Sequence, residues 1–586
     1  MARRLRISRR IVAVVVAVLM AALAANASPT GAEPFEGTNE TIRNHSLVFA
    51  AGSGHTCAID SDAQLRCWGA ASFGQLGQGN QNTIGDGPGE MGSNLPPIDL
   101  GTGRTTVAVG VGSGFTCALL DDGSVKCWGD NPFGILGIGK SQGSVGAHPD
   151  EMGDNLPPID LGTGRTAVAI SVGGGHTCAL LDNHDLKCWG FNTAGGLGQG
   201  DSLIRGGDPD EMGDNLPPID LGTGRTAVAV SAGGGTTCAI LDNGDLKCWG
   251  ANREGQMGQG YKASSLNFGP GSELHIGDAP GEMGDNLPPV DLGTGRTAVA
   301  VSASSRHICA ILDNGELKCW GAGYDGRTGR GDSELIGDEP GEMGDNLPPV
   351  DLGTGRTAIA VSTGQEFTCA LLDNGTVKCF GWNFWGQLGQ GHTDDIGDDP
   401  GEMGDSLPPV DLGTGRTAVA ISAGSQFACA LLDNSELKCW GNNAGGQLGQ
   451  GNFEWVGDDP AEMGDNLPAI DIPSAGGPWL DCHDRRPTGY WLGEADGTIY
   501  PFGDADTLGN TTLASGTTLV DTEATPTGCG YWTLRADGAI GQFGDAPDLG
   551  DLDLGSLTAG ENLASFSPTP TGQGLWAFTD RGRVLT

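Results

Sequence analysis

The segment "HICAILDNGELKCWG" (His307–Gly321) decides the fold of this chain. Two runs of apolar and β-branched residues flank the turn "DNG" (313–315), whose glycine can take the left-handed conformation that a three-residue hairpin loop requires. With that loop, Cys309 lies directly opposite Cys319 at a Cβ separation of about 4.5–5.5 Å. The segment therefore predicts an antiparallel hairpin closed by a disulfide.

The same hairpin occurs seven times, and successive first cysteines lie 60, 61, 60, 71, 60 and 60 residues apart. The pairs are Cys57 with Cys67, Cys117 with Cys127, Cys178 with Cys188, Cys238 with Cys248, Cys309 with Cys319, Cys369 with Cys379 and Cys429 with Cys439. A fixed period with several strands per repeat is typical of propeller blades. We predict seven disulfides within the blades; the alternatives are free buried thiols or metal ligands, and no second pair or histidine recurs beside them.

Each hairpin lies between two further predicted strands. The run "RTAVAVSA" (296–303) precedes the hairpin, and "LPPVDLG" (347–353) follows the next turn, where proline suits an edge or a strand start. No helical period occurs in the unit. The sequence therefore predicts an all-β fold, a seven-bladed β-propeller over residues 46–473.

A family resemblance rests on stretches such as "GGGHTCALLDNHDLKCWGFNTAGGLGQG" (173–200). It resembles the regulator of chromosome condensation repeat, and the resemblance covers about residues 46–473. It implies a seven-bladed β-propeller. Two members of that family imply different functions. Its namesake is a guanine nucleotide exchange factor; that alternative rests on the family resemblance alone, because the resemblance lies in the repeat scaffold and no exchange residue is carried over. A secreted β-lactamase inhibitor binds a protein with one propeller face.

Residues 1–27 read as a secretory signal peptide, with five arginines before a short apolar run and a small-residue cleavage site. An uncleaved anchor is the alternative; no later segment is apolar enough to span a membrane. Residues 28–45 are a predicted linker. Without the five arginines the chain has 26 Lys+Arg against 73 Asp+Glu, a net charge near −47. We expect a secreted, extracellular or cell-envelope protein that does not bind nucleic acid.

Residues 474–586 form a second predicted domain. "PTGYWLGEADGTIYPFGDADTLG" (487–509) returns as "PTGCGYWTLRADGAIGQFGDAPDLG" (526–550). These copies resemble tandem Gly-Tyr-Trp repeats of bacterial secreted proteins and predict a small β-repeat domain. Cys482 and Cys529 are the cysteines left over, and we expect them to pair. Docking of this region on wall polymer would make the chain a structural cell-envelope protein.

The acidic phrase "IGDEPGEMGDNLPPVDLGTGRTA" (336–358) recurs almost verbatim between successive hairpins. Its oxygen donors Asp338, Glu342, Asp345 and Asn346 make a weak Ca²⁺ candidate. The favoured interpretation is a structural connector, in which acids keep the surface soluble, Asp and Asn bond their own backbone, and the recurring Met tucks into the blade. No other metal or cofactor is expected.

The differences between copies carry the functional prediction. A Trp after each second cysteine, replaced once by Phe380, suits the core between blades. Trp382, Trp385 and Trp455 do not recur, so they are recognition candidates. No H-E-x-x-H set is present, and no helix is predicted that could form a nucleophile elbow with a serine. We therefore predict a secreted, non-enzymatic scaffold whose variable turns bind a protein or cell-surface glycan; the sequence does not predict the oligomeric state.

Overall fold

The computed structural model describes residues 48–60, 62–141, 143–261, 275–473, 490–493, 499–502, 517–524, 530–544, 552, 554, 557, 561–568, 575–581 and 583–585. These residues form two compact units, one ending near residue 475 and one made of later residues. All regular elements among them are β-strands or short 3-10 turns, so the all-β prediction is confirmed. No helix of the described segments is long and apolar enough to cross a bilayer. The limits predicted for the signal peptide, linker and domains stay predictions.

Seven antiparallel sheets follow one another along the described part of residues 48–473, and we number them 1 to 7 in chain order. The first strands are β1 (Val48–Ala51), β4 (Thr106–Val111), β8 (Ala167–Val172), β11 (Ala227–Ala232), β15 (Ala298–Ala303), β18 (Ala358–Thr363) and β21 (Ala418–Ala423). The second strands are β2 (His55–Ile59), β5 (Phe115–Leu120), β9 (His176–Leu181), β12 (Thr236–Leu241), β16 (His307–Leu312), β19 (Phe367–Leu372) and β22 (Phe427–Leu432). The third strands are β3 (Leu65–Gly69), β6 (Val125–Asp130), β10 (Leu186–Gly190), β13 (Leu246–Ala251), β17 (Leu317–Gly321), β20 (Val377–Gly381) and β23 (Leu437–Gly441).

The hairpin register is the one that the sequence predicts. Cys309 pairs with Cys319 across β16 and β17, and Gly315 has φ +80°, in the left-handed region. All seven predicted pairs of the hairpins are disulfide-bonded, with Cα–Cα distances of 4.1 Å. The bonds join Cys57 to Cys67, Cys117 to Cys127, Cys178 to Cys188, Cys238 to Cys248, Cys309 to Cys319, Cys369 to Cys379 and Cys429 to Cys439. Cys482 and Cys529 lie outside the described residues, so their pairing stays a prediction.

A fourth segment pairs with the third strand in every sheet. It is β7 (Ser144–Val145) in sheet 2 and β14 (His275–Ile276) in sheet 4. In the other sheets it is a single bridge: Gly69–Ile84, Gly190–Arg205, Gly321–Ile336, Gly381–Ile396 and Gly441–Val456. The fourth strand therefore comes from the start of the acidic phrase.

The prediction that residues 347–353 supply the fourth strand is wrong. Pro348 and Pro349 have no N–H to donate to a ladder. Val350 N makes the one ladder-like bond of this segment, 2.7 Å to Leu317 O at the start of β17. The segment therefore covers the end of its own sheet instead of extending it.

Buried tryptophans tie each sheet to its neighbour. The recurring tryptophans, all 0% exposed, are Trp68, Trp128, Trp189, Trp249, Trp320 and Trp440, and Phe380 is equally buried in sheet 6. Five of them donate their indole N–H at 3.0–3.1 Å to a carbonyl in the loop after the third strand of the preceding sheet: Trp68 to Gln447, Trp128 to Gln75, Trp249 to Gly196, Trp320 to Gln256 and Trp440 to Gln387. The interpretation of these residues as core between blades is confirmed.

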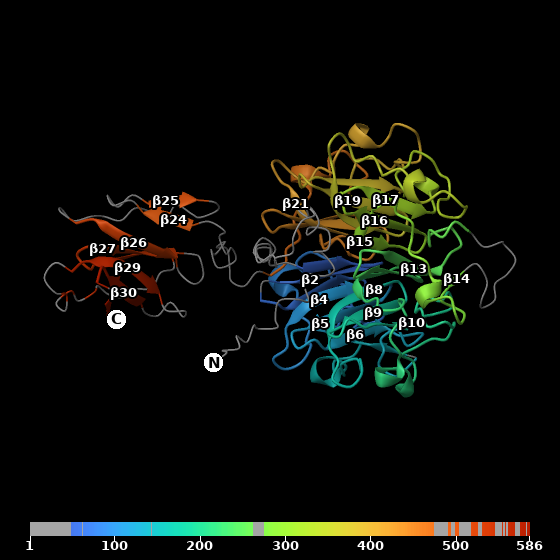
Figure 1. Ribbon diagram of the computed structural model, residues 1–586, viewed down its shortest axis with the longest axis horizontal. Helices are drawn as coiled ribbons and strands as arrows, with labels where there is room; N and C mark the ends of the chain where they lie inside the picture. The colour runs from blue at the N-terminus through green and yellow to red at the C-terminus, as the bar shows by residue number, and fades with distance from the viewer. Residues whose placement is uncertain are drawn as a thin grey trace. The chain divides into compact units, whose positions relative to one another are not determined.

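Sheets 1 and 7 meet and close the ring. Figure 1 shows the blue strands of sheet 1 beside the orange strands of sheet 7. Ala51 N donates to Ser422 Oγ at 3.0 Å, and Gly92 N donates to Asp471 O at 2.8 Å. Each sheet is continuous in sequence, so closure depends on contacts between complete sheets. The β-propeller prediction is confirmed.

Short 3-10 turns lie mainly in the acidic phrases. They are η1 (Gly92–Asn94), η2 (Gly153–Asn155), η3 (Pro209–Glu211), η4 (Gly213–Asn215), η5 (Gly284–Asn286), η7 (Gly344–Asn346), η8 (Gly404–Ser406) and η9 (Gly464–Asn466). One more, η6 (Tyr324–Gly326), lies in the loop after β17.

The second unit contains three small antiparallel sheets within its described segments. Their strands are β24 (Tyr490–Gly493), β25 (Ile499–Phe502), β26 (Leu519–Ala524), β27 (Gly530–Arg535), β28 (Ile540–Gly544), β29 (Leu563–Pro568), β30 (Leu575–Thr579) and β31 (Val584–Leu585). Trp532, Leu534, Ile540, Leu563 and Ala577 form its buried core. The unit is therefore a β-repeat structure with its own apolar centre.

Three fully buried histidines bridge neighbouring sheets. His55 Nε2 lies 2.8 Å from Thr116 Oγ1, and that hydroxyl donates to Gln75 O at 2.9 Å, so the histidine is the donor. His176 and His307 make the same contact, with Thr237 and Thr368. Burial lowers the pKa of His55 and His307 to about 3 and that of His176 to about 4. All three are therefore neutral in the folded protein at physiological pH.

We predict that these histidines make the propeller sensitive to acid. Histidine in an unfolded chain has a pKa of about 6.5, so the unfolded state binds more protons once the pH falls below that value. Folding stability is then lost as the pH falls from about 6.5 towards 4, by up to about 1.4 kcal/mol per pH unit for each histidine. Replacing all three by phenylalanine, the residue that sheets 2, 6 and 7 carry at this position, should flatten the decline in melting temperature between pH 7 and 4.5.

The matched control is His392→Gln, which changes an exposed histidine and should keep the wild-type slope. Equal acid sensitivity of the wild type and the triple variant would show that the buried imidazoles do not control this behaviour.

Candidate binding face

The turns between the first and second strands and the loops after the third strands meet at one end of the sheets. Backbone hydrogen bonds join them: Asp130 N donates to Gly114 O, Phe191 N to Gly175 O and Trp382 N to Glu366 O, at 2.9–3.0 Å. We call this end the loop face. Its turns contain residues 52–54, 112–114, 173–175, 233–235, 304–306, 364–366 and 424–426. The sequence varies most at this end, so it is where recognition is expected.

An asparagine fixes the root of most of these loops. Asn383 Nδ2 donates to His392 O at 2.7 Å, and its Oδ1 accepts Leu388 N at 3.0 Å. Asn131, Asn192, Asn252 and Asn443 make equivalent bonds in their own loops. Sheet 5 has Gly323 there; instead Arg327, 1% exposed, donates to Tyr324 O and Asp325. The loop roots are therefore held while the residues between them differ.

The structure brings Trp382, Trp385 and Trp455 together and adds Phe384. The Trp385 and Trp455 rings meet edge to face at 4.1 Å, and Phe384 lies 4.8 Å from Trp385, 5.9 Å from Trp382 and 6.1 Å from Trp455. Phe384 is 53% exposed and Trp455 36% exposed. We call these four residues the aromatic cluster. The rings pack edge to face and still leave apolar surface exposed to water. An exposed apolar patch of this kind is typical of contact sites.

An acidic side chain borders the aromatic cluster. Asp395 is half-buried and accepts the N–H of Asn383 at 2.8 Å. Burial raises the pKa of Asp395, while the hydrogen bond from the Asn383 N–H lowers it. Asp325 and Asp398 also raise this pKa through charge repulsion. The cluster therefore combines exposed rings with negative charge.

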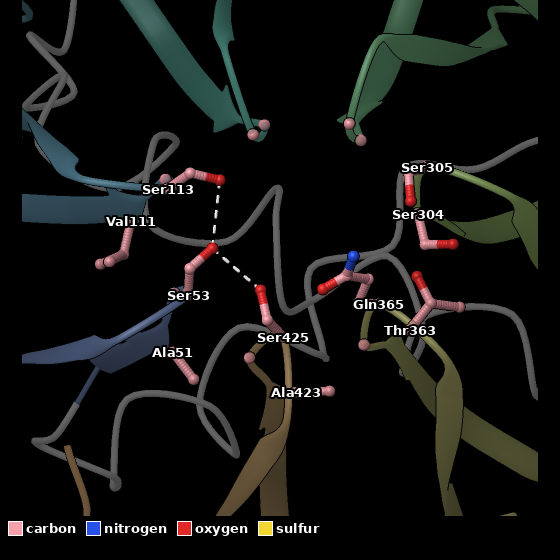
Figure 2. A pocket seen from close by; sticks show the side chains of 18 of the residues that line it. Ala51, Ser53, Val111, Ser113, Ser304, Ser305, Thr363, Gln365, Ala423 and Ser425 are labelled. Atoms are coloured by element: carbon pink, nitrogen blue, oxygen red, sulfur yellow. Dashed lines mark hydrogen bonds between the residues drawn. The ribbon is translucent and has the colours of Figure 1, made fainter. Parts of the chain in front are cut away.

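An axial pocket of about 260 Å³ opens where the turns of all seven sheets converge. Figure 2 shows Ser53, Ser113 and Ser425 linked across it: Ser425 Oγ donates to Ser53 Oγ at 2.8 Å, and Ser53 Oγ donates to Ser113 Oγ at 3.1 Å. Gln365 projects beside them. The pocket wall is mostly glycine and small hydroxyl side chains, so it presents backbone and no charged group.

The acidic phrase makes its own contacts, away from the loop tips. Glu342 Oε2 accepts three backbone N–H groups, from Gly337, Asp338 and Glu339, at 2.9–3.1 Å. Asp345 accepts Thr294 N at 2.8 Å together with the Thr294 hydroxyl, which holds the pKa of Asp345 below its usual value.

The other two calcium candidates also have partners within the protein. Asn346 Nδ2 donates to Gly341 O at 2.8 Å, and Asp338 is buried. In the described part of the chain, no three His, Cys, Asp or Glu side chains are grouped to hold a metal ion. The contacts support the connector interpretation, and the calcium hypothesis stays untested.

Lysine and methionine fasten the phrase to the sheets. Lys318 in β17 donates through Nζ to Leu292 O at 3.0 Å and Gly344 O at 2.8 Å, and burial lowers its pKa. Met343 is 8% exposed. A Cβ at Gly258 of the preceding loop would lie 3.0–3.1 Å from Trp320, Val290 and Met343, so only glycine fits there without a shift. The predicted tuck of the methionine is confirmed.

The chain is a β-propeller whose sheets repeat closely and whose loops differ in sequence at the loop face. A family model described as RCC1-like domain matches residues 26–403, and a second, described as Regulator of chromosome condensation (RCC1) repeat, matches residues 418–447. The chain belongs to the RCC1-like family.

Several known proteins are similar over most of this chain. The ultraviolet-B receptor UVR8 of Arabidopsis thaliana is 27% identical over 459 residues, which are 75% of this chain and 88% of the receptor. The mitochondrial RCC1 domain-containing protein RUG3 of the same plant is 27% identical over 69% of this chain and 84% of its own length. Human E3 ubiquitin-protein ligase HERC2 is 25% identical, over 68% of this chain and 7% of the ligase. Yeast RCC1 (Prp20), solved bound to Kap60, gives a TM-score of 0.49 at 16% identity over 81% of this chain and 90% of that one.

Sequence reasoning missed three features of this site. Phe384 stands in the same loop as Trp382 and Trp385, so the search for unusual aromatic residues could have included it. The axial pocket has a signal in the triplets before the second strands, which consist of Gly and Ser in the first four sheets. The buried lysine recurs as "K" before the second cysteine in six copies, with Arg66 in the first.

We predict that Glu342→Ala loosens the phrase locally. Three N–H groups, two of them in buried residues, lose a charged acceptor, a loss of about 1–3 kcal/mol. Hydrogen exchange at Gly337, Asp338 and Glu339 should accelerate about tenfold to a hundredfold, while the exposed neighbour variant Glu339→Ala should leave it unchanged. A chelator should have no effect on exchange; slowing of exchange by added Ca²⁺ would support the calcium hypothesis instead.

Proposed function

We propose that this chain is an exported, non-enzymatic scaffold that binds a protein through its loop face. The aromatic cluster is the observation that carries this proposal. Interface hot spots are enriched in tryptophan and are surrounded by contacts that exclude water. Phe384 and Trp455 both meet Trp385 edge to face, at 85–86°, so most of the cluster is an uneven surface; one pair, Trp382 and Phe384, lies nearly parallel at 10°. The cluster therefore favours a protein partner over a glycan.

Export is part of the same proposal. Seven disulfides form and persist in oxidising compartments and are rare where thioredoxin and glutathione keep thiols reduced. The N-terminal signal pattern supports the same location. A partner would then be an extracellular or envelope protein.

The export proposal predicts the state of the natural protein. Mass spectrometry of the protein recovered from the culture medium should give Ser28 as its first residue and no free thiol at the fourteen hairpin cysteines. A chain lacking residues 1–27 should stay in the cell with reduced cysteines. Recovery of an intracellular protein that keeps Met1 and free thiols would contradict export.

The binding proposal predicts that Phe384→Ala combined with Trp455→Ala strongly weakens partner capture. Loss of two exposed anchors of this kind should cost about 2 kcal/mol or more, which is roughly a thirtyfold loss of affinity. Partners would be identified from the culture medium and extracellular surface fraction as proteins retained by the wild type, and their affinities would be measured by biolayer interferometry.

Two exposed phenylalanines outside the aromatic cluster give matched controls. Phe453→Ala, in the loop that contains Trp455, and Phe73→Ala, in sheet 1, should retain the same partners; these residues are 52% and 43% exposed. Equal capture by the double variant and both controls would remove the aromatic cluster as the contact site.

A further inference from the structure

A second pocket, of about 340 Å³, lies on the loop face between sheets 2 and 3. Phe133, Phe191, Asp130, His176 and Ser113 line it together with glycines of three successive turns. Its volume is near the lower limit for a small-molecule site, about 300 Å³, so it suits a single side chain or a small group.

Two aromatic rings form one wall. Phe133 and Phe191 lie 4.9 Å apart with their planes at 49°, and Phe133 is 42% exposed. They come from the loops after β6 and β10, so the wall depends on the packing of two sheets. Aromatic rings that line a cavity can attract a cation through their negative faces.

Asp130 supplies the charge in this pocket. Its Oδ1 accepts the N–H of Asn131 at 3.0 Å, and burial raises its pKa. No lysine, arginine or histidine of the described segments is paired with it, in contrast to Asp60, which bonds Arg66 at 2.8 Å. A half-buried carboxylate without a cation costs solvation free energy that a cationic ligand would restore.

The histidine in the pocket wall, His176, would not repel a cationic ligand. His176 Nε2 is 2.8 Å from Thr237 Oγ1, and burial lowers its pKa to about 4. It is therefore neutral at physiological pH and adds no positive charge. Ser113 is a further polar group at the edge, and its Oγ accepts a hydrogen bond from Ser53 Oγ.

Glycine keeps the floor of this pocket open. Gly114, Gly175 and Gly235 occupy the position directly before the second strand, where sheets 5 to 7 have Arg306, Glu366 and Gln426. In sheet 7, Gln426 occupies the equivalent position and accepts a bond from Asn442 Nδ2 at 2.9 Å. The open pocket is therefore a departure from the pattern of the other half of the ring.

We propose that this pocket takes the guanidinium group of an arginine side chain on a protein partner. A guanidinium is planar and weakly hydrated, so it stacks on aromatic rings while donating to a carboxylate. The aromatic wall of Phe133 and Phe191 matches the first property, and Asp130, which has no cationic partner among the described residues, matches the second. The inference rests on the proposed function only in taking a protein as the source of the arginine.

The test uses N-acetyl-arginine methylamide as a probe and N-acetyl-citrulline methylamide as its uncharged isostere, titrated against the full chain by ligand-observed NMR. The arginine probe should bind about tenfold more tightly than the citrulline probe, as expected for a charge pair in a half-buried site. Asp130→Asn should reduce arginine binding to the citrulline level. Asp150→Asn, which removes the same charge from an exposed position in the phrase after sheet 2, should leave it within about twofold of the wild type.

Two variants taken from the chain's own repeats give independent readings. Phe133→Ala copies Ala194 of sheet 3 and should weaken binding several-fold; Gly175→Gln copies Gln426 of sheet 7 and should close the pocket. Near-UV circular dichroism checks that each variant is folded. Equal binding of both probes, equal binding by Asp130→Asn, or no binding by the folded wild type overturns the inference. Because the probes are small molecules, these outcomes are independent of whether the aromatic cluster captures a protein.

Discussion

The ring depends on a hydrogen bond from a buried indole N–H to a loop carbonyl of the preceding sheet. In the fully buried interface the bond is stronger than in water, and leaving either group unpaired would cost about 1–3 kcal/mol. The carbonyl of Gln75 accepts both Trp128 Nε1 and the Thr116 hydroxyl. Five of the seven loops are therefore fastened at the root by an indole of the following sheet. The tips, which face solvent, can change their residues without changing the ring.

The acidic phrase also stabilises the ring, through contacts of its own with the sheets. Its carboxylates bond backbone N–H groups, its carbonyls accept a buried lysine, and its methionine packs under a tryptophan. Every one of these contacts needs a particular side chain at a particular place, which accounts physically for near-identical copies. A phrase whose donors are already bonded within the protein is poorly suited to discriminate between ligands. The residues that repeat between copies are therefore consistent with a role in building the ring. The residues that differ between copies are consistent with a role in recognition.

Local and periodic features could be predicted from the sequence because short-range geometry determines them. The hairpin register follows from the spacing of Cys309 and Cys319 around a glycine turn, and the propeller follows from the period. The fourth strand could not be predicted correctly, since a single bridged residue such as Ile336 has no strand pattern. Asp130 had no signal either, because the lack of a paired cation among the described residues is a property of tertiary packing. Trp382 and Trp385 could be selected as unusual, but their meeting with Trp455 depends on how sheets 6 and 7 pack.

A pseudo-symmetric ring poses a problem for a binding scaffold, since identical repeats would hold a partner equally well in several rotations. Departures from symmetry remove that degeneracy. The aromatic cluster lies on sheets 6 and 7, and the acidic pocket lies between sheets 2 and 3 over a glycine floor. Under the proposed function, a partner that contacts both sites fits in one orientation, because any rotation separates its anchors from the aromatic cluster and from Asp130. A difference of about 1.4 kcal/mol between orientations already favours one of them tenfold. The sheets that differ most from the repeat would thus set the orientation, while the sheets that match it keep the two sites at a fixed separation.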